Sequence, residues 1–456
     1  MSPSVSYNRH ITEIPKGDSM EKVKIKVVVQ AKPVGVPGWP HINYNYEKKT
    51  KEVMDCVRAY NPDAEFDVFQ YSYVEEAEKA YEEDMKNYDG IFLLLITNWR
   101  DLDHFYAQKA KNGLPCAIAA VEYCGSGSIL LIGSTIKKNN LPVPTVSSSD
   151  LNDIARLARV LVVNAKLKKS SILIIRNDVQ DELQKKATER FGVSFVNRNS
   201  VDLMKMFDEV DENEALEVVK KWTNNAVAVL EPSHSDILES AKLYIAIRRM
   251  TEEVNASAVT IDCLTLSYND DLGKNRHMYP CLSHFQMMED GGLGVCEADI
   301  DSTIASLMVL YTTGRYGFVS DPVIDTSSDR IIYAHCVACR KVLDVNDPRI
   351  CEYYIRSHAE DQMGASVQVI FPEGEKLTTV NVYNAEDCAS IHSSVSIGNA
   401  GNDAGCRSKL VAKCNSQKIL ENWMPIWHRV TVYGDYRKDF MDFFKLKSLN
   451  VIEEDV

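Results

Sequence analysis

The feature that most constrains the fold is a repeated alternation of apolar strand-like runs and amphipathic helix-like segments. The runs "VKIKVVVQ" (23–30), "YDGIFLLLI" (88–96) and "CAIAAVEY" (116–123) are almost wholly apolar, and helix-like segments at 45–60, 74–86 and 100–112 separate the strands of this part. Strands that are apolar on both faces are typical of a parallel sheet covered by helices on both sides. The first part of the chain is therefore predicted to be an α/β domain.

Residues 170–265 repeat this alternation after a helical stretch at 149–168. The predicted strands are "SSILIIR", "VSFVNR", "AVAVLEP" and "AVTIDCL", and the predicted helices start near Gln180 and cover 211–223 and 235–252. After about residue 290, one helix (298–313) is followed by short strands, several of which alternate in polarity, as antiparallel strands do. The predicted fold class is α/β, with two Rossmann-like parallel-sheet domains followed by a β-rich, barrel-like C-terminal domain.

The length of 456 residues fits two or three domains. We expect a polar N-terminal extension over 1–20, an N-terminal α/β domain over 21–165 and a second α/β domain over 166–290. The β-rich domain is expected over 291–456, and it carries the candidate reactive residues described below.

Charge and composition exclude several classes of partner. A net charge of −14 argues against a nucleic-acid or anionic-membrane partner, because such partners need a basic face. No apolar run approaches the ~20 residues of a membrane span, and the first 20 residues lack the apolar core of a secretory signal. The twelve cysteines are scattered through apolar segments, as buried cysteines are in a reducing compartment. A cytoplasmic protein is expected.

Phosphate-binding motifs are missing from the predicted strand-to-helix turns, which contain no GxGxxG or GxxxxGK[ST]. "CGSGS" (124–128) is interpreted as a flexible loop, with a phosphate-binding turn as the alternative. The CxxC of "HCVAC", Cys336 and Cys339, has no second pair at zinc-ribbon spacing. The two cysteines are interpreted as small buried apolar side chains, with a zinc site as the alternative.

Two acidic residues, Glu297 and Asp321, flank the helix-like segment "ADIDSTIASLMVLYTT". That helix would be about 24 Å long, and Gly314 supplies its C-terminal stop. The following "RYGFVSD" spans about 23 Å when extended, so a strand that returns along the helix brings Asp321 back to Glu297. The alternative is that Glu297 and Asp299 are first-turn acids of the helix and that Asp321 begins a turn before Pro322. Two adjacent carboxylates repel each other unless a cation lies between them.

Two histidines open or close apolar strands in the same region. His428 precedes "RVTVYG" after a Trp-rich approach, and His335 ends "RIIYAH". From the residues alone, each can be a packed amphipathic side chain or a metal ligand.

Taken together, these segments resemble the L-fucose/L-arabinose isomerase superfamily, and its L-fucose isomerase side most closely. The resemblance rests on Glu297, the segment "YTTGRYGFVSD" ending at Asp321, and His428 before "RVTVYG", with "DRIIYAHC" similar to a strand near the family's active site. The order of the predicted domains, two α/β domains and then a β-rich domain, also matches the family, so the resemblance covers most of the chain. Its specific motifs lie in the C-terminal third.

The resemblance implies that Glu297, Asp321 and His428 bind a divalent cation, usually Mn²⁺, and that the two carboxylates also act as acid and base. It further implies that Gln30 and Trp99 reach the sugar from a neighbouring subunit of a homo-oligomer, a trimer or a hexamer. His335 is the candidate for a fourth ligand or a substrate contact. Trp427 stands where L-fucose isomerase has a small polar residue, which leaves the sugar open.

The expected function is that of an Mn²⁺-dependent aldose–ketose isomerase acting on a free sugar through a cis-enediol(ate) intermediate. A hard cation beside two carboxylates and a histidine suits this chemistry, because it stabilises charge on two sugar oxygens while a base works at carbon. The alternatives are a non-catalytic sugar-binding or regulatory paralogue, and a divergent member such as an epimerase or an isomerase of a modified sugar. Which carboxylate is the base stays open.

Overall fold

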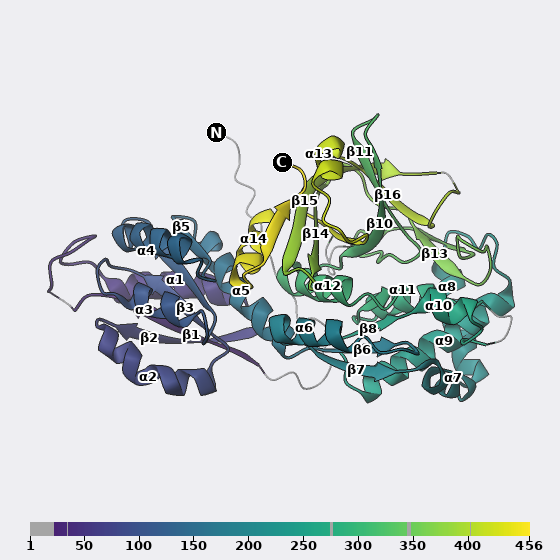
Figure 1. Ribbon diagram of the computed structural model, residues 1–456, viewed down its shortest axis with the longest axis horizontal. Coiled ribbons are helices and arrows are strands. Elements are labelled where there is room, and N and C mark those ends of the chain that lie inside the picture. The colour runs from purple at the N-terminus through teal and green to yellow at the C-terminus, as the bar shows by residue number, and fades with distance from the viewer. Residues whose placement is uncertain (1–21, 34, 274–276, 344–347, 402) are drawn as a thin grey trace. The chain divides into compact units, whose positions relative to one another are not determined.

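The computed structural model describes residues 22–33, 35–273, 277–343, 348–401 and 403–456 (Figure 1). The expected polar extension over 1–20 lies outside these residues. The described chain forms two compact units. Unit 1 comprises residues 22–166 and Lys438–Leu449, and unit 2 comprises Leu167–Arg437 and Asn450–Val456.

Unit 1 contains a five-stranded parallel sheet in the order β2-β1-β3-β4-β5. Its strands are β1 (Val23–Gln30), β2 (Ala64–Tyr71), β3 (Gly90–Leu95), β4 (Cys116–Val121) and β5 (Thr145–Ser148). The helices are α1 (Tyr46–Tyr60), α2 (Val74–Asn87), α3 (Leu102–Lys109), α4 (Ser126–Asn139), α14 (Arg437–Leu446) and α5 (Leu151–Lys168), which runs into unit 2. β3 and β4 are fully buried, as their apolar sequences predict.

The start of α4 differs from the sequence-based interpretation, because "CGSGS" opens a helix and is not a loop. The cap comes from a distant residue: the Asn98 side-chain oxygen accepts hydrogen bonds from the backbone amides of Gly127 (2.9 Å) and Ser128 (3.0 Å). Amide groups that a phosphate-binding turn would offer are therefore already bonded within the protein.

Unit 2 begins with a four-stranded parallel sheet in the order β7-β6-β8-β9. Its strands are β6 (Ser171–Ile175), β7 (Ser194–Arg198), β8 (Ala258–Ile261) and β9 (Gly294–Cys296). The helices are α6 (Asp181–Phe191), α7 (Ser200–Asp208), α8 (Glu212–Asn225), α9 (His234–Glu253), α10 (Cys263–Tyr268) and α11 (Cys281–Glu289). The predicted strand "AVAVLEP" is wrong: Val229 forms only an isolated bridge to Ile355, and the side chain of Leu230 is 55% exposed.

The second part of unit 2 is an antiparallel six-stranded barrel, in the order β14-β17-β10-β11-β16-β15, that closes through pairing of β14 with β15. Its strands are β10 (Phe318–Asp325), β11 (Arg330–His335), β14 (Lys376–Tyr383), β15 (Cys388–Asn399), β16 (Ser408–Lys413) and β17 (Arg429–Tyr433). β18 (Asn450–Glu453) adds to β15 in parallel, and β12 (Tyr353–Arg356) and β13 (Ser366–Val369) form a separate ribbon. A short helix, α13 (Ser416–Glu421), follows β16.

One buried helix, α12 (Ile300–Thr313), connects the two parts of unit 2. It contacts β8 and β9 of the parallel sheet and β14 and β17 of the barrel. Figure 1 shows α12 between the barrel strand β14 and the parallel sheet of unit 2. All its residues are buried, which explains why its sequence is apolar on nearly every side. The fold class is thus confirmed: two parallel-sheet α/β domains and a β-rich, barrel-forming C-terminal part. Within the described residues, no helix is both long and apolar enough to cross a bilayer.

Candidate metal centre

Four side chains of unit 2 converge where the parallel sheet, α12 and the barrel meet. Glu297, Asp321, His335 and His428 each offer one ligand atom, and these atoms all lie within 4.8 Å of one another. Because metal bonds to oxygen and nitrogen are about 2.0–2.6 Å long, two ligands of one ion lie at most about 4–5 Å apart. The metal cluster, as these four residues are called below, has the size that one ion requires.

Glu297 is positioned by the carboxyl end of β9. The backbone N–H of Ala298 donates to the carbonyl of Ile261 (2.9 Å), which continues the pairing of β8 with β9 past the last paired residues. Glu297 and Ala298 both have positive φ, 66° and 50°. Non-glycine residues in this region cost about 1–3 kcal/mol each and are found mostly where function requires an unusual direction of the chain. This turn between β9 and α12 holds Glu297 where its carboxylate lies close to Asp321, His335 and His428.

Asp321 and His428 are brought together by the barrel. β10 and β17 are antiparallel with Ser320 opposite Arg429, so the next position along β10 faces the residue before β17. Those two residues are Asp321 and His428. On its other side, β10 pairs with β11, where Asp321 lies opposite Ala334, one residue before His335.

The distances within the metal cluster are short but are not those of a closed hydrogen-bond network. His428 Nε2 lies 3.1 Å from Asp321 Oδ1 and 3.5 Å from Glu297 Oε2, and His335 Nε2 lies 3.6 Å from Glu297 Oε1. None of these contacts has the geometry of a hydrogen bond: His428 Nε2 and both ring nitrogens of His335 are buried without a partner. Buried polar atoms without partners are costly, which makes an exogenous ligand at this position favourable.

Two buried imidazoles with free nitrogens facing two carboxylates fit a divalent transition metal or Mn²⁺. The observation also bears on the alternative raised above, that Glu297 and Asp321 are merely a first-turn acid and a turn residue. The structure places them side by side, with α12 capped by a different acid, Asp299.

Asp299 does two jobs. Its side chain accepts a hydrogen bond from the backbone N–H of Ser302 (2.9 Å), which caps α12. Its other oxygen lies 2.7 Å from His428 Nδ1. A carboxylate that holds the far nitrogen of a ligand histidine fixes the orientation of the ring and makes its second nitrogen a better ligand. The motif "EADIDS" marks Asp299 only as an acid at the start of a helix, so nothing in the sequence indicates its hydrogen bond with His428.

Electrostatic effects in the metal cluster favour an ionised Asp321 and a protonated His428 when no ion is bound. Burial lowers the pKa of His428, but the hydrogen bond with Asp299 and the contact with Asp321 outweigh it, so the pKa lies well above its ordinary value. Burial raises the pKa of Asp321, but His428 and His335 reverse the effect, and the pKa is lowered. A metal ion therefore has to displace a proton from His428.

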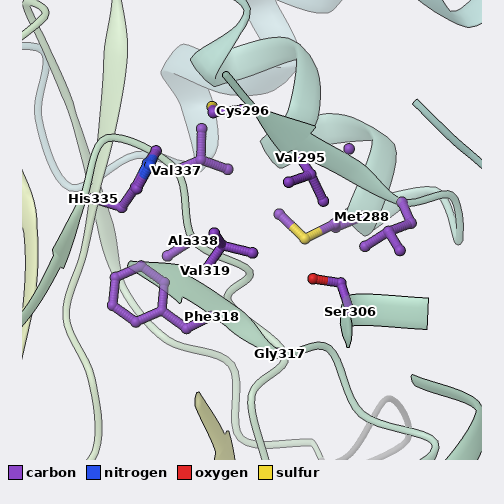
Figure 2. A pocket seen from close by; sticks show the side chains of 12 residues that line it. Met288, Val295, Cys296, Ser306, Gly317, Phe318, Val319, His335, Val337 and Ala338 are labelled. Carbon is purple, nitrogen blue, oxygen red and sulfur yellow. The ribbon is translucent and has the colours of Figure 1, made fainter. Parts of the chain in front are cut away.

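A small cavity lies against His335 (Figure 2), lined by Ser306 and by apolar side chains such as Met288, Phe318 and Val319. Gly294 also lines it, and a Cβ at this position would overlap the ring of His284. His284 is fully buried with neither ring nitrogen bonded, and burial together with nearby His335 lowers its pKa to about 3. His284 is therefore a neutral neighbour of the metal cluster.

The remaining sequence-predicted residues lie outside the metal cluster. Gln30, at the end of β1, is buried, and its side-chain oxygen has no partner; Trp99 is 58% exposed with φ of 58°. Both belong to unit 1. Trp427, next to His428, is 68% exposed. The position of Gln30 at the carboxyl end of a parallel strand is typical of ligand-binding residues in α/β folds.

Comparison with known proteins adds no family to this picture: no family model matches the chain, and no curated protein matches it. The geometry of the metal cluster therefore carries the functional interpretation.

Proposed function

We propose that the chain is a metal-dependent aldose–ketose isomerase whose centre holds Mn²⁺ or another divalent cation. The observation that carries the proposal is the set of unpartnered nitrogens of His335 and His428 beside the carboxylates of Glu297 and Asp321. His335 is proposed as the fourth ligand.

The mixed oxygen and nitrogen donors restrict the metals that fit. Oxygen-rich sites with imidazole suit Mn²⁺, Fe²⁺ or Co²⁺ better than Ca²⁺, which prefers oxygen alone. No cysteine belongs to the metal cluster, and its donors are not the thiolates of structural zinc sites. When bound, the cation would stabilise the negative charge that develops on two adjacent sugar oxygens during isomerisation.

The residues around this position have separable roles in the proposal. The side chain of Glu297 is 33% exposed and that of Asp321 is 19% exposed, so both can be reached by a small ligand. We assign them the proton transfers at carbon and oxygen of the sugar, in an order that is left open. Asp299 holds the His428 ring, and His428 in turn keeps Asp321 ionised.

The substrate in this proposal is a free sugar, and the compartment is the cytoplasm. The resemblance of the segments around Glu297, Asp321 and His428 to sugar isomerases supports the first part. All twelve cysteines are free in the structure, which supports a reducing compartment. A net charge of −14 disfavours nucleic acid as a partner.

We further propose a homo-oligomer in which Gln30 and Trp99 contribute to the site of a neighbouring copy. Support comes from the unpartnered oxygen of buried Gln30 and from the exposure of Trp99. Mixing the inactive variants Trp99→Ala and Glu297→Gln should restore part of the activity, because some mixed sites then contain both native residues. Absence of complementation in a mixture shown to exchange subunits would contradict sharing.

The test of the main proposal uses the full chain, reduced and loaded with Mn²⁺. A panel of aldoses and ketoses is incubated in D₂O and followed by NMR. Interconversion of one aldose–ketose pair with deuterium at C1 or C2 is expected. Epimerisation at C2 without a ketose would identify the divergent alternative, and binding without any exchange would identify a sugar-binding protein. Either result would overturn the isomerase proposal.

A further inference from the structure

Ser306 is a buried polar residue in the apolar helix α12. It is 1% exposed, and its hydroxyl has no hydrogen-bond partner among the described residues. Two threonines of the same helix bond their hydroxyls to the backbone one turn earlier. Thr303 donates to the carbonyl of Asp299 (2.6 Å). Thr313 donates to the carbonyl of Val309 (2.8 Å). Because a buried hydroxyl without a partner is unfavourable, Ser306 needs an explanation that lies outside the helix.

Ser306 and His335 line the same small cavity, and Figure 2 shows them on opposite sides of it. The cavity offers about 20 Å³ to the centre of a water molecule. About 10–15 Å³ of such space holds one water, provided that at least two polar groups bind it. Apolar side chains such as Met288, Phe318 and Val319 make up most of the remaining wall. The cavity therefore has room for about one water, and Ser306 and His335 are two polar groups that can hold it.

His335 has one ring nitrogen left for such a contact. Its Nε2 lies 3.6 Å from Glu297 Oε1 and so faces the metal cluster. Its Nδ1 is buried and has no hydrogen-bond partner in the described part of the chain. A histidine that binds a metal through one nitrogen almost always donates the N–H of the other to a carboxylate, a carbonyl or a water. Asp299 is that acceptor for His428 (2.7 Å), whereas the structure gives His335 no such acceptor from its described residues.

Helix α12 is placed to support both histidines of the metal cluster. Asp299, its N-cap, and Ser306 are seven positions apart, which is about two helical turns and places them on the same face. Asp299 holds His428 directly, and Ser306 lines the cavity beside His335. The unpartnered ring of His284 is a less suitable partner, because His284 is not one of the residues that line the cavity.

We propose that this cavity is a water site, in which one ordered water accepts a hydrogen bond from His335 Nδ1 and donates one to Ser306 Oγ. Ser306 is then a positioning residue for His335. It fixes the water that orients the imidazole ring and favours the tautomer whose Nε2 is free to bind the metal. The inference rests on the proposed function, because it concerns a ligand of the same metal centre.

The water itself is tested by an experimental structure of the full chain, reduced and loaded with Mn²⁺, at a resolution that shows ordered solvent. We expect a peak of density in the cavity within about 3.2 Å of both Ser306 Oγ and His335 Nδ1. A cavity without such a peak, or a Ser306 hydroxyl turned to the carbonyl of Ser302, would overturn the proposal.

The role of the hydroxyl is tested with Ser306→Ala, which removes it and keeps a good helix former at the position. We expect the Mn²⁺ affinity, measured by electron paramagnetic resonance, to fall about tenfold, the lower end of the effect of groups that orient metal ligands. Ser283→Ala is the matched control. Ser283 is a fully buried serine of α11 whose hydroxyl also lacks a partner within the described residues, but it does not line the cavity. This control should bind Mn²⁺ as wild type does. Equal affinity in Ser306→Ala and wild type would contradict the role of Ser306.

A double-mutant cycle separates the positioning of His335 from a general effect on the fold. In the His335→Gln background, Ser306→Ala should cause no further loss of Mn²⁺ affinity, because the ring that the water orients is gone. The same tenfold loss in both backgrounds would show that Ser306 does not act through His335. Wild type is measured first, and its failure to bind Mn²⁺ would overturn the metal centre and the proposed function. Binding by wild type with no effect of Ser306→Ala would overturn this inference alone.

Discussion

Two clusters of histidine and carboxylate side chains in unit 2 differ in whether all their buried polar atoms have hydrogen-bond partners. The first is the metal cluster. The second, which we call the barrel network, consists of Tyr333, His392, Arg429 and Glu454, whose side chains are fully buried. Tyr333 contacts His392 Nε2 (2.8 Å), His392 Nδ1 contacts Glu454 (2.7 Å), and Arg429 donates to the other Glu454 oxygen (2.5 Å).

In the barrel network every side-chain nitrogen and oxygen of the four residues has a partner. The remaining donors of Arg429 bond to the carbonyls of Met424, Ile426 and His428, and the backbone N–H of Met424 donates to Glu454. In the metal cluster, three imidazole nitrogens have none. The same residue types therefore make a closed structural network in one place and an open site in the other. What separates them is hydrogen-bond completeness, because an open buried site costs stability unless something binds there.

Removing one carboxylate from the metal cluster should abolish function and leave the stability of the fold nearly unchanged. We expect Glu297→Gln and Asp321→Asn each to lower isomerase activity about 10²–10⁴-fold or more, because a proton-transfer group and a ligand are lost together. The metal-free proteins should unfold within a few degrees of wild type. The measurements are turnover of the sugar identified by NMR and thermal unfolding followed by circular dichroism.

Asp325→Asn is the matched control, because Asp325 ends the same strand, β10, and pairs with Arg330 outside the metal cluster. It should keep its activity. Near-normal turnover in either cluster variant would remove the proposed roles of Glu297 and Asp321.

Removing the carboxylate of the barrel network should instead break the fold. Glu454→Gln leaves the Arg429 guanidinium buried without its counter-charge, which costs about 3–5 kcal/mol of unfolding free energy. Burial opposes ionisation of Glu454, but His392 and Arg429 lower its pKa to about 2. A lowered carboxylate pKa stabilises the native state above the unfolded value of 4.5, and this stability is lost as the pH falls towards 2.

Urea unfolding of wild type and Glu454→Gln between pH 3 and 7 measures both effects. The variant should be less stable at pH 7 and should lack the part of the acid dependence that Glu454 contributes. At urea concentrations at which Glu454→Gln is still folded, the variant should bind Mn²⁺ with the affinity of wild type. If Glu454→Gln had the unfolding free energy of wild type, the complete hydrogen bonding of the barrel network would not be a source of stability.

An intermediate effect is expected at Asp299, which links the metal cluster to its surroundings. Asparagine caps a helix as well as aspartate does, so Asp299→Asn should leave α12 intact. Its amide presents a donor or a weaker acceptor to His428 Nδ1, and Mn²⁺ affinity should fall about 10–100-fold. Calorimetric titration with Mn²⁺ measures the change. Unchanged affinity, with the cap preserved, would show that Asp299 only caps the helix.

The sequence predicted those features that depend on local pattern or on simple length. Apolar runs located β1, β3 and β4, and the out-and-back length of α12 and β10 placed Asp321 beside Glu297. The same reasoning failed where a distant residue decides local structure. The cap of α4 comes from Asn98, and "AVAVLEP" lies beside β12 without joining a sheet.

The support of the site was also beyond the sequence. Asp299 and His428 are 129 positions apart, and nothing local to either one indicates their hydrogen bond. The positive φ of Glu297 is a property of the turn and not of the residue type, because glutamate seldom adopts it. His335 and His392 lie in similar apolar strands. Only the packed barrel shows that both ring nitrogens of His392 have hydrogen-bond partners and that those of His335 have none.

The pH dependence of metal binding is the smallest expected effect. It tests directly whether the free nitrogen of His428 is a metal ligand. With the pKa of His428 raised well above 6.5, its Nε2 carries a proton at neutral pH, and a metal ion has to displace it. Mn²⁺ affinity should therefore fall about tenfold, or 1.4 kcal/mol, for each pH unit below that raised pKa. Above the pKa of His428, the Mn²⁺ affinity should become independent of pH.

Calorimetric titrations between pH 6 and 9 in buffers of different ionisation enthalpy measure this. At the lowest pH of this range, about one proton should be released for each ion bound. Asp299→Asn removes the hydrogen bond that contributes most to raising the pKa of His428, so the fall in Mn²⁺ affinity should begin at a lower pH in this variant. An affinity that stays flat from pH 6 to 9 in wild type would show that His428 is not the group the metal binds.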